Sequence, residues 1–456
     1  MLRWKKRGQG GGPALAPTKA EIIDRAKTLN VRFVRLQFTD ILGVLKNVAI
    51  PVELLPDALD GRIMFDGSSI EGFVRVEEYD LFLAPDPETF AVFPWKPKEG
   101  TTARLMCDIK NPDGSPFAGC PRTALRRVLA EAREMGYEVT IGVEPEFFLF
   151  QQDATGQATT RPIDQAGYFD LSPVDLGEDA RREMVLTLQE MGFGIDATHH
   201  EVAPGQHEID LSFTDALAAA DNIATFRFVV RTIARLHGLH ATFMPKPIYG
   251  LNGSGLHLFH VLWSGGENAF HDPRQPQGLS RVALQFIAGL MRHAPAITAI
   301  TNPLVNSYKR LVPGYEAPVY IAWSSSNRSP MVRVPAHQGA DTRIELRSPD
   351  PACNPYLALA ATIKSGLDGI RHRMEPPPPV TRNIYRMSES ERRQLGIQNL
   401  PASLEEALKH LEQDAVVLAA LGPEIAERYV EAKRIEWDIY RQQVHPWEIE
   451  QYLNEY

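Results

Sequence analysis

Six residues with side chains that bind hard metal ions lie in short segments whose apolar and polar positions alternate as in β-strands. They are Glu144 and Glu146 in GVEPEFFLF, Glu201 and Glu208 in HHEVAPGQHEID, His257 in NGSGLHLF, and Glu345 in RIELRSPD. Side chains two apart on a strand point to the same face, so Glu144 and Glu146 project together. A Glu-x-Glu pair alone is more often a solvated face, but VTIGV and FFLF flank this pair and predict a buried strand. Buried carboxylates at this density need bound cations, so the sequence predicts a sheet that carries a metal site.

A Pro-Gly turn separates Glu201 from Glu208 and can bring both carboxylates to one ion. Together with the other four residues, they offer oxygen and imidazole groups that suit two divalent ions such as Mg²⁺ or Mn²⁺. His199 and His200 precede Glu201 and also have metal-binding side chains. We interpret these two histidines as supporting or core groups rather than ligands.

The segment NGSGLHLFHVLW indicates by its parity which histidine faces the site. His257 and Phe259 share one strand face, whereas His260 lies on the other, so we expect His260 to pack in the core. Residues 252–255 (NGSG) expose backbone N–H groups free of bulky side chains, as needed where a small polar substrate lies against the main chain. Neither the phosphate-binding pattern GxxxxGK[ST] nor the dinucleotide pattern GxGxxG occurs in the chain.

Five arginines fall within 38 residues around Glu345. They are Arg310, Arg328, Arg333, Arg343 and Arg347. Guanidinium groups bind carboxylate and phosphate oxygens through paired hydrogen bonds, and so many near a carboxylate cluster favour an anion-binding site over surface ion pairs. The nearby segment LVPGYEAP carries Glu316 among Pro, Gly and small residues, which is typical of a movable flap.

The bulk composition limits the possible classes of function. A net charge of −9 argues against a nucleic-acid coat and against binding to an anionic membrane surface. No apolar run is long enough for a transmembrane helix. The three cysteines, Cys107, Cys120 and Cys353, share no metal-type spacing, and we expect free thiols in a reducing cytoplasm.

We expect two domains after an N-terminal segment. Residues 1–17 contain basic residues, Gly and Pro but no apolar core of a signal peptide, which predicts a disordered extension or a cloning remnant. Residues 18–117 read as a small α+β unit that starts with a helix at Lys19–Leu29, capped by Thr18. Its segment MFDGSSIEGF (64–73) is expected to be a loop. Residues 118–456 hold the predicted metal strands, intervening helices and a charged helical tail.

Several long motifs resemble those of type I bacterial and archaeal glutamine synthetases, in the family's order. They are MFDGSSIEGF, GVEPEFFLF, HHEVAPGQHEID, NGSGLH, NSYKRLVPGYEAP, NRS and RIELRSPDPACNPYLALA. MSESERRQLGIQNLPASLEEAL resembles the feedback-regulated alpha branch. The resemblance implies an α+β fold, with a small N-terminal β-grasp domain and a larger catalytic domain of curved antiparallel sheet with surrounding helices. It also implies a homo-dodecamer of two stacked hexameric rings, with each active site between neighbouring subunits.

Residue by residue, the resemblance implies two metal sites and a glutamate site. One ion would bind Glu146, Glu201 and Glu208, and the other would bind Glu144, His257 and Glu345. Glutamate would lie against Asn252 and Gly253, with its carboxylates met by Arg310 and Arg347. Arg328, Arg333 and Arg343 would face the phosphates of ATP.

The resemblance also assigns the ammonium pocket and regulatory positions. Asp66 of the adjacent subunit would bind ammonium and help remove its proton, with Tyr168 and Glu201 close by, and Glu316 would cover the intermediate. Arg75 matches a position tied to glutamine feedback. Three residues on the nucleotide side depart from the family: Phe259 stands where a polar residue or histidine is common, Val261 where a serine is common, and Asp196 where a longer Glu is usual.

The activity implied is ATP-dependent ligation of ammonia to the γ-carboxylate of L-glutamate through γ-glutamyl phosphate, in the cytoplasm. One alternative is a ligase that joins glutamate to a bulkier amine; Asp66, Tyr168 and Glu316 favour ammonium, because a bulky amine does not need a compact anionic cage. The other is a non-catalytic regulatory homologue, which the six retained metal-type residues disfavour. A second role through binding a nitrogen-regulatory protein is compatible with the alpha-branch resemblance.

Overall fold

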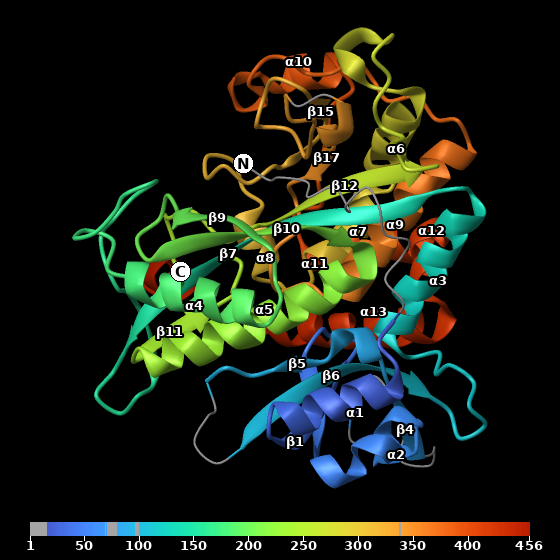
Figure 1. Ribbon diagram of the computed structural model, residues 1–456. Helices are drawn as coiled ribbons and strands as arrows, with labels where there is room; N and C mark the ends of the chain where they lie inside the picture. The colour runs from blue at the N-terminus through green and yellow to red at the C-terminus, as the bar shows by residue number, and fades with distance from the viewer. Residues whose placement is uncertain (1–15, 69, 71–79, 96–99, 337–338) are drawn as a thin grey trace.

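The computed structural model describes residues 16–68, 70, 80–95, 100–336 and 339–456, and forms a small N-terminal unit beneath a larger one (Figure 1). The extension expected over residues 1–17 lies almost wholly outside the described residues. The small unit begins with α1 (Lys19–Thr28), and Thr18 and Glu21 form the predicted capping box at its start.

The sheet of the small unit has the strand order β2-β1-β6-β4-β3, and β5 also pairs with β6. Only the β1–β6 pair among these is parallel. The strands and the second helix are β1 (Val31–Thr39), β2 (Leu45–Pro51), α2 (Leu55–Leu59), β3 (Ile63–Asp66), β4 (Asp80–Pro85), β5 (Ala91–Val92) and β6 (Thr101–Lys110). The expectation of a loop from residue 64 onward was therefore wrong for its first three residues, which pair with β4 as part of β3.

The large unit is built on a ten-stranded sheet with the order β15-β16-β17-β12-β7-β10-β9. Three further strands, β8, β11 and β13, pair with β7 or β12 outside this path. The pairs are antiparallel except β15–β16, so the predicted antiparallel sheet has one parallel pair at its edge. The strands are β7 (Glu138–Gln152), β8 (Ala158–Pro162), β9 (Ile195–His200), β10 (Gln206–Asp215), β11 (Leu239–Thr242), β12 (Leu256–Ser264), β13 (Glu267–Asn268), β15 (Trp323–Ser324), β16 (Val332–Arg333) and β17 (Ile344–Leu346).

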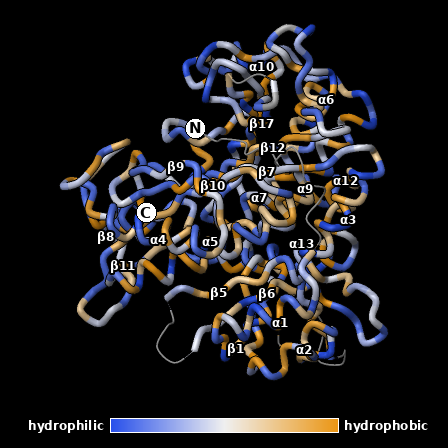
Figure 2. The backbone as a smooth tube through the Cα atoms, viewed as in Figure 1, coloured by the Kyte–Doolittle hydropathy of each residue, from blue (hydrophilic) through white to orange (hydrophobic). Residues whose placement is uncertain are grey.

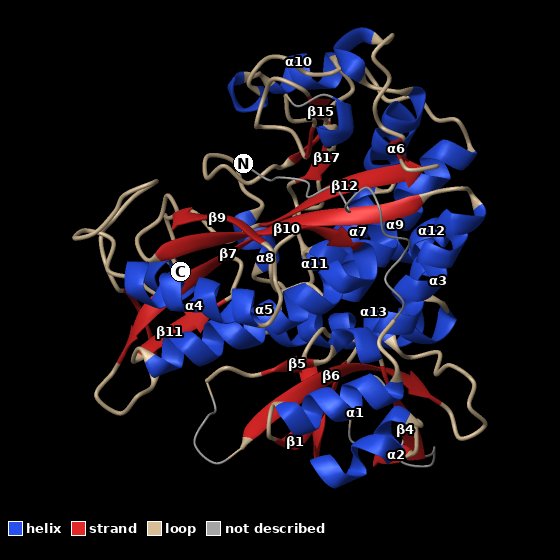
Figure 3. Ribbon diagram, in the orientation of Figure 1, coloured by secondary structure: helices blue, strands red, loops and turns tan. Residues whose placement is uncertain are grey.

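Helices cover one side of this sheet, whereas loops cover the side that carries the candidate site. Figure 3 shows α4 and α5 beneath β7 and β10, with loops on the opposite side. Helices α3, α5, α6, α7 and α12 pack against α9, which is almost entirely buried. Outer loops such as those around α10 are largely hydrophilic (Figure 2). The helices are α3 (Pro121–Glu134), α4 (Glu178–Glu190), α5 (Ala216–Leu236), α6 (Arg281–Arg292), α7 (Ala294–Thr301), α8 (Ser307–Arg310), α9 (Pro355–Arg371), α10 (Glu389–Gln394), α11 (Leu404–Gln413), α12 (Ala415–Leu421), α13 (Pro423–Tyr440) and α14 (Pro446–Tyr452).

A buried arginine joins the two units. Arg122, at the start of α3, contacts Asp86 and Asp108 of the small unit at 2.7 and 3.0 Å, and Asp221 of α5 at 2.9 Å. The hydroxyl of Tyr356 donates to the same Asp221 carboxylate at 2.7 Å. A buried guanidinium with three carboxylate partners leaves little freedom for the small unit to swing. Among the described residues, no helix combines the length and apolar character needed to cross a membrane.

Candidate active site

The register of four neighbouring strands places five of the six predicted metal-binding residues on one face of the large sheet, and Glu201 follows the end of β9. Glu146 on β7 lies opposite Glu208 on β10, and Glu144 lies opposite His257 on β12. Directly opposed residues in an antiparallel pair point to the same face, so these four side chains converge. Glu345 on β17 lies opposite Phe259, which shares the face of His257.

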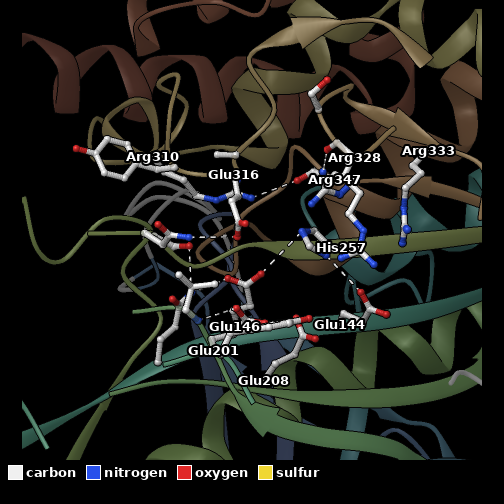
Figure 4. A pocket seen from close by; sticks show the side chains of 18 of the residues that line it. Glu144, Glu146, Glu201, Glu208, His257, Arg310, Glu316, Arg328, Arg333 and Arg347 are labelled. Carbon is white, nitrogen blue, oxygen red and sulfur yellow. Dashed lines mark hydrogen bonds and ion pairs between the residues drawn. The ribbon is translucent and has the colours of Figure 1, made fainter. Parts of the chain in front are cut away.

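A cavity of about 610 Å³ opens over this face. The six residues predicted to bind metal all line it, as do Asn252, Gly253, Arg310, Arg347, Tyr168, Glu316, Arg328 and Arg333. Figure 4 shows the carboxylates on the strand side and the arginines facing them across the cavity. Segments from Glu144 to Tyr385 therefore form one site, as the sequence predicts for most of these residues.

The donor atoms lie close enough together to share divalent cations. Oxygen or nitrogen atoms of Glu144, Glu208 and His257 lie within 4.8 Å of one another, and so do those of His199, Glu201 and Glu208. The Nδ1 atom of His257 is 3.3 Å from Glu144 Oε2. Carboxylate and imidazole donors of this kind fit divalent ions, and Glu208 belongs to both groups.

The Glu345 carboxylate connects the metal-type residues to the arginines. Its Oε1 atom is 3.2 Å from Arg347 Nε and 3.8 Å from His257 Nδ1, and its Oε2 atom pairs with Arg333. Arg310 is buried and donates to the carbonyl of Ser348 at 2.7 Å. An anion entering the cavity therefore meets guanidinium groups that the protein already holds in place.

Without bound cations, the Glu144 and Glu201 carboxylates of the site resist ionisation. Burial and the neighbouring Glu345 raise the pKa of Glu144 to about 8, and burial and Glu146 raise the pKa of Glu201 to about 9. Burial and Arg347 lower the pKa of His257 to about 4, which leaves its imidazole neutral and able to bind a metal. Ionising these buried carboxylates therefore costs free energy, and bound cations would reduce that cost.

Mg²⁺ is expected to stabilise the protein more at about pH 8.5 than at about pH 6.5. Glu144 and Glu201 have native pKa values above those of the unfolded chain, so between these pH values the native state binds more protons than the unfolded state. The stability of the metal-free protein therefore falls as pH rises, while Mg²⁺ competes with fewer protons. Thermal unfolding with and without Mg²⁺ at both pH values measures this. An equal Mg²⁺-induced shift in Tm at the two pH values would contradict it.

Gln206 is a site residue that the sequence prediction missed. Its Nε2 atom donates to Glu146 Oε2 at 2.8 Å, and the backbone N–H of Gly255 donates to the same oxygen at 2.9 Å. Gln206 begins β10 and lies two residues before Glu208, so strand parity could have placed it on the site face. The other missed residues that line the cavity are Val202, Gly314, Tyr315, Ala317, Asn327, Ser329, Asn383 and Tyr385.

Several predicted residues lie outside the lining of the cavity. Phe259 is buried beneath the guanidinium of Arg343, whose Cζ atom is 5.6 Å from the ring centroid. Asp196 on β9 accepts a hydrogen bond from Ser212 at 2.5 Å. Asp66 ends β3 in the small unit, where its carboxylate accepts from the backbone and hydroxyl of Ser68. Arg75 lies outside the described residues. Their proposed roles remain predictions.

His200 supports the loop that carries Glu201. It is buried, and its two ring nitrogens contact the Glu201 carbonyl at 2.7 Å and Asp164 Oδ1 at 3.2 Å. Asp164 also accepts from the backbone N–H of Gly205 at 2.8 Å, in the turn before Glu208. These contacts fit the supporting role predicted for His200, whereas His199 lies between Glu201 and Glu208.

Asp164, Asp175, His200 and His207 also come within 4.8 Å of one another through potential ligand atoms. The guanidinium of Arg181 reaches this group and contacts Asp175 at 2.8 Å and His207 at 2.7 Å. A protein cation therefore already partners Asp175 and His207 of this second cluster.

The loop from Gly314 to Ala317 covers one side of the cavity. Gly314 and Glu316 have φ angles of 98° and 63°, in the left-handed region that a glutamate seldom adopts. The amide of Asn252 donates to the Glu316 carboxylate at 3.3 Å, and the hydroxyl of Tyr385 donates to the carbonyl of Ala317 at 2.6 Å. Tertiary contacts therefore hold this flap in its position.

Comparisons with known proteins agree with the fold. Residues 118–452 match the family model "Glutamine synthetase, catalytic domain", and residues 30–112 match "Glutamine synthetase, beta-Grasp domain". The chain is 56% identical over 439 residues to the glutamine synthetase of Clostridium saccharobutylicum, covering 96% of this chain and 99% of that protein. It is also 56% identical over 440 residues to that of Staphylococcus aureus strain MRSA252, with the same coverage.

Solved structures show the same fold. A complex of GmaS with ADP superposes with a TM-score of 0.87 at 35% identity, over 95% of this chain and 99% of that one. Plasmodium falciparum glutamine synthetase superposes with a TM-score of 0.84 at 27% identity, over 96% and 99% of the two chains. These matches confirm the predicted β-grasp and catalytic domains, and the chain belongs to the glutamine synthetase family.

Proposed function

We propose that the chain is a glutamate–ammonia ligase that forms L-glutamine from L-glutamate, ammonium and ATP. The observation that carries this proposal is one cavity in which six metal-type residues face a row of arginines. A carboxylate is a poor electrophile because it is anionic and lacks a leaving group, and phosphorylation removes both obstacles. Such a step brings two anions together, which is the task that cations on both sides of a cavity can perform.

We infer that the six residues hold two Mg²⁺ or Mn²⁺ ions, one near Glu146, Glu201 and Glu208 and one near Glu144, His257 and Glu345. When bound, these ions would neutralise charge on the phosphates and on the transferring phosphoryl group. The donor chemistry supports this, because carboxylates with raised pKa values and a neutral imidazole surround the same space. The GmaS–ADP complex of the same fold supports a nucleotide site.

In the first step, a γ-carboxylate oxygen of glutamate attacks the terminal phosphorus of ATP, and ADP leaves with the electrons of the broken bond. Asn252 and Gly253 would lie against the amino acid, and Arg310 and Arg347 would meet its carboxylates. Arg328, Arg333 and Arg343 would face the phosphates, with Asp196 and Phe259 nearer the rest of the nucleotide. The buried position of Arg310 and the lining by Arg328, Arg333 and Arg347 support these roles.

In the second step, ammonium loses a proton to a carboxylate, and ammonia attacks the acyl carbon of γ-glutamyl phosphate. The carbon–oxygen bond to phosphate breaks, and phosphate leaves with the electron pair. Asp66 of a neighbouring copy would bind the ammonium, beside Tyr168 and Glu201. Glu316 on the flap would exclude water from the intermediate. Tyr168, Glu201 and Glu316 all line the cavity, which supports this pocket.

We infer a homo-oligomer, specifically a dodecamer of two hexameric rings, in which Asp66 acts at the site of another subunit. No described residue before Glu144 lines the cavity, and Asp66 belongs to the small unit that Arg122 holds against α3 and α5. A neighbouring copy is therefore needed to bring an Asp66 side chain to the site. The three buried free cysteines are compatible with a cytoplasmic enzyme.

ATP-dependent phosphate release should be strong with glutamate, Mg²⁺ and ammonium, with glutamine as product. Hydroxylamine should also act as the amine substrate, whereas a polyamine should not. The carboxylates of Glu201 and Glu316 line the cavity and suit a small cation such as ammonium. Parallel assays of phosphate and of the amide product measure this. Turnover only with the polyamine would make the chain a γ-glutamyl-amine ligase, and no turnover of the assembled protein with any amine would indicate a regulatory homologue.

A further inference from the structure

Lys246 is a buried cation next to the site whose charge no carboxylate balances within ion-pair distance among the described residues. It is 8% exposed, and its ammonium donates to the carbonyl of Leu251 and lies 3.8 Å from the ring centroid of Tyr315. Its backbone is fixed by two hydrogen bonds with the Asn306 amide, at 2.8 and 3.0 Å. The backbone position of Lys246 is therefore fixed, and its ammonium lies on the face of an aromatic ring. Cation–π contacts of this kind are strongest where water is excluded.

The two partners of this ammonium belong to two loops that have separate roles in the proposed chemistry. Leu251 immediately precedes Asn252 and Gly253, against which glutamate is proposed to lie. Tyr315 is the central residue of the flap, between the positive-φ residues Gly314 and Glu316. A backbone in this conformation persists only where tertiary contacts determine it.

The segment around Lys246 is packed too closely to adjust. A Cβ atom added at Gly253 would lie 2.2 Å from the Pro245 carbonyl oxygen and 3.3 Å from Lys246 Cδ. The backbone N–H of Ser254 also donates to the Pro245 carbonyl at 2.9 Å. The lysine side chain thus runs directly behind the glutamate-binding loop to reach the flap.

We propose that Lys246 is a positioning residue that latches the flap closed through the face of Tyr315 and ties it to the glutamate-binding loop at Leu251. This inference rests on the proposed function, because it concerns the shielding of γ-glutamyl phosphate. When the flap opens early, water attacks the acyl carbon, the bond to phosphate breaks, and glutamate is regenerated. The net reaction is then hydrolysis of ATP to ADP and phosphate without glutamine.

The diagnostic quantity is the ratio of phosphate released to glutamine formed. Tyr315→Leu removes the aromatic face and should therefore raise the ratio. The fraction of γ-glutamyl phosphate lost to hydrolysis, calculated from the ratio, is expected to increase by about tenfold. Tyr315→Phe keeps the face and should keep the wild-type ratio, since the hydroxyl is not needed for the contact. Tyr249→Leu is the matched control, because Tyr249 follows Lys246 in the same loop but is fully exposed.

A double-mutant cycle separates the contact from general damage. Lys246→Met is expected to uncouple the reaction as Tyr315→Leu does, and the double variant should be no more uncoupled than either single variant, because all three lack the same contact. Lys246→Arg retains a cation that can lie on the ring and should restore most of the coupling. Additive effects in the double variant, or a wild-type ratio in folded Tyr315→Leu protein, would overturn the latch.

Parallel assays of the wild-type protein distinguish a failure of the proposed ligase activity from a failure of the latch. If wild-type protein forms no glutamine from ammonium, the proposed function fails, and the latch with it. If wild-type protein forms glutamine with a ratio near one phosphate per glutamine and Tyr315→Leu does the same, only the latch fails.

Discussion

Glu345→Ala is expected to lower the rate of phosphoryl transfer by about a thousandfold, because it removes a carboxylate that a metal and two arginines would share. In the structure, the Glu345 carboxylate contacts Arg333 and Arg347 and lies 3.8 Å from His257. Without it, two guanidinium groups face each other next to a weakened metal site. Single-turnover formation of ADP from ATP and glutamate, at saturating Mg²⁺, measures the loss.

Two further variants isolate the role of the charge. Glu345→Gln keeps the size of the side chain but not its charge, and it should also be severely impaired. Glu267→Ala removes an exposed carboxylate on β13 and should leave the rate unchanged. Near-normal turnover by Glu345→Ala, in protein whose Tm shows that it is folded, would contradict the assignment of Glu345 to the metal site.

Asp66→Ala is expected to lower glutamine formation from ammonium by about a hundredfold while leaving formation of the acyl phosphate nearly intact. The first step needs no group that accepts a proton from ammonium, so the defect should appear in the second step. Hydroxylamine is largely uncharged near neutral pH and should be affected less. Rates with the two amines, together with ADP formation in a single turnover, measure the difference.

Asp113→Ala is the matched control, because the exposed Asp113 carboxylate accepts from the backbone and hydroxyl of Ser115, as that of Asp66 does from Ser68. Mixed assemblies of Asp66→Ala and Glu345→Ala subunits should also regain activity, since an intact Asp66 of one subunit can complete the site of another. Equal losses with both amines and in ADP formation would remove the proposed role of Asp66. No recovery in mixed assemblies would place Asp66 outside its neighbour's site.

Local sequence patterns predicted the strands of the site, but they could not predict which strands are neighbours. Parity placed Glu144 and Glu146 on one face because side chains alternate along a strand regardless of the rest of the fold. The pairing of β7 with β12 and β10, which brings His257 and Glu208 to these residues, depends on contacts far apart in sequence. That part of the prediction came from the family resemblance rather than from the residues.

The residues that were missed differ in how well the sequence could have indicated them. Gln206 shares strand parity with Glu208 and was within reach of the same argument that identified Glu144 and Glu146. Tyr385 reaches the cavity from a single helical turn, and Lys246 lies next to the site on a loop. No periodicity relates either side chain to the cavity. Phe259 was placed on the correct strand face, but only the structure shows that Arg343 covers it.

In the proposed mechanism, ATP phosphorylates the γ-carboxylate of glutamate before ammonia attacks it. The most direct test uses glutamate whose γ-carboxylate carries isotopically labelled oxygen, converted to glutamine with ATP and ammonium. If γ-glutamyl phosphate forms, its bridging oxygen comes from glutamate, and each phosphate released should contain one labelled oxygen atom. Glutamine formation with unlabelled phosphate would exclude γ-glutamyl phosphate as the intermediate.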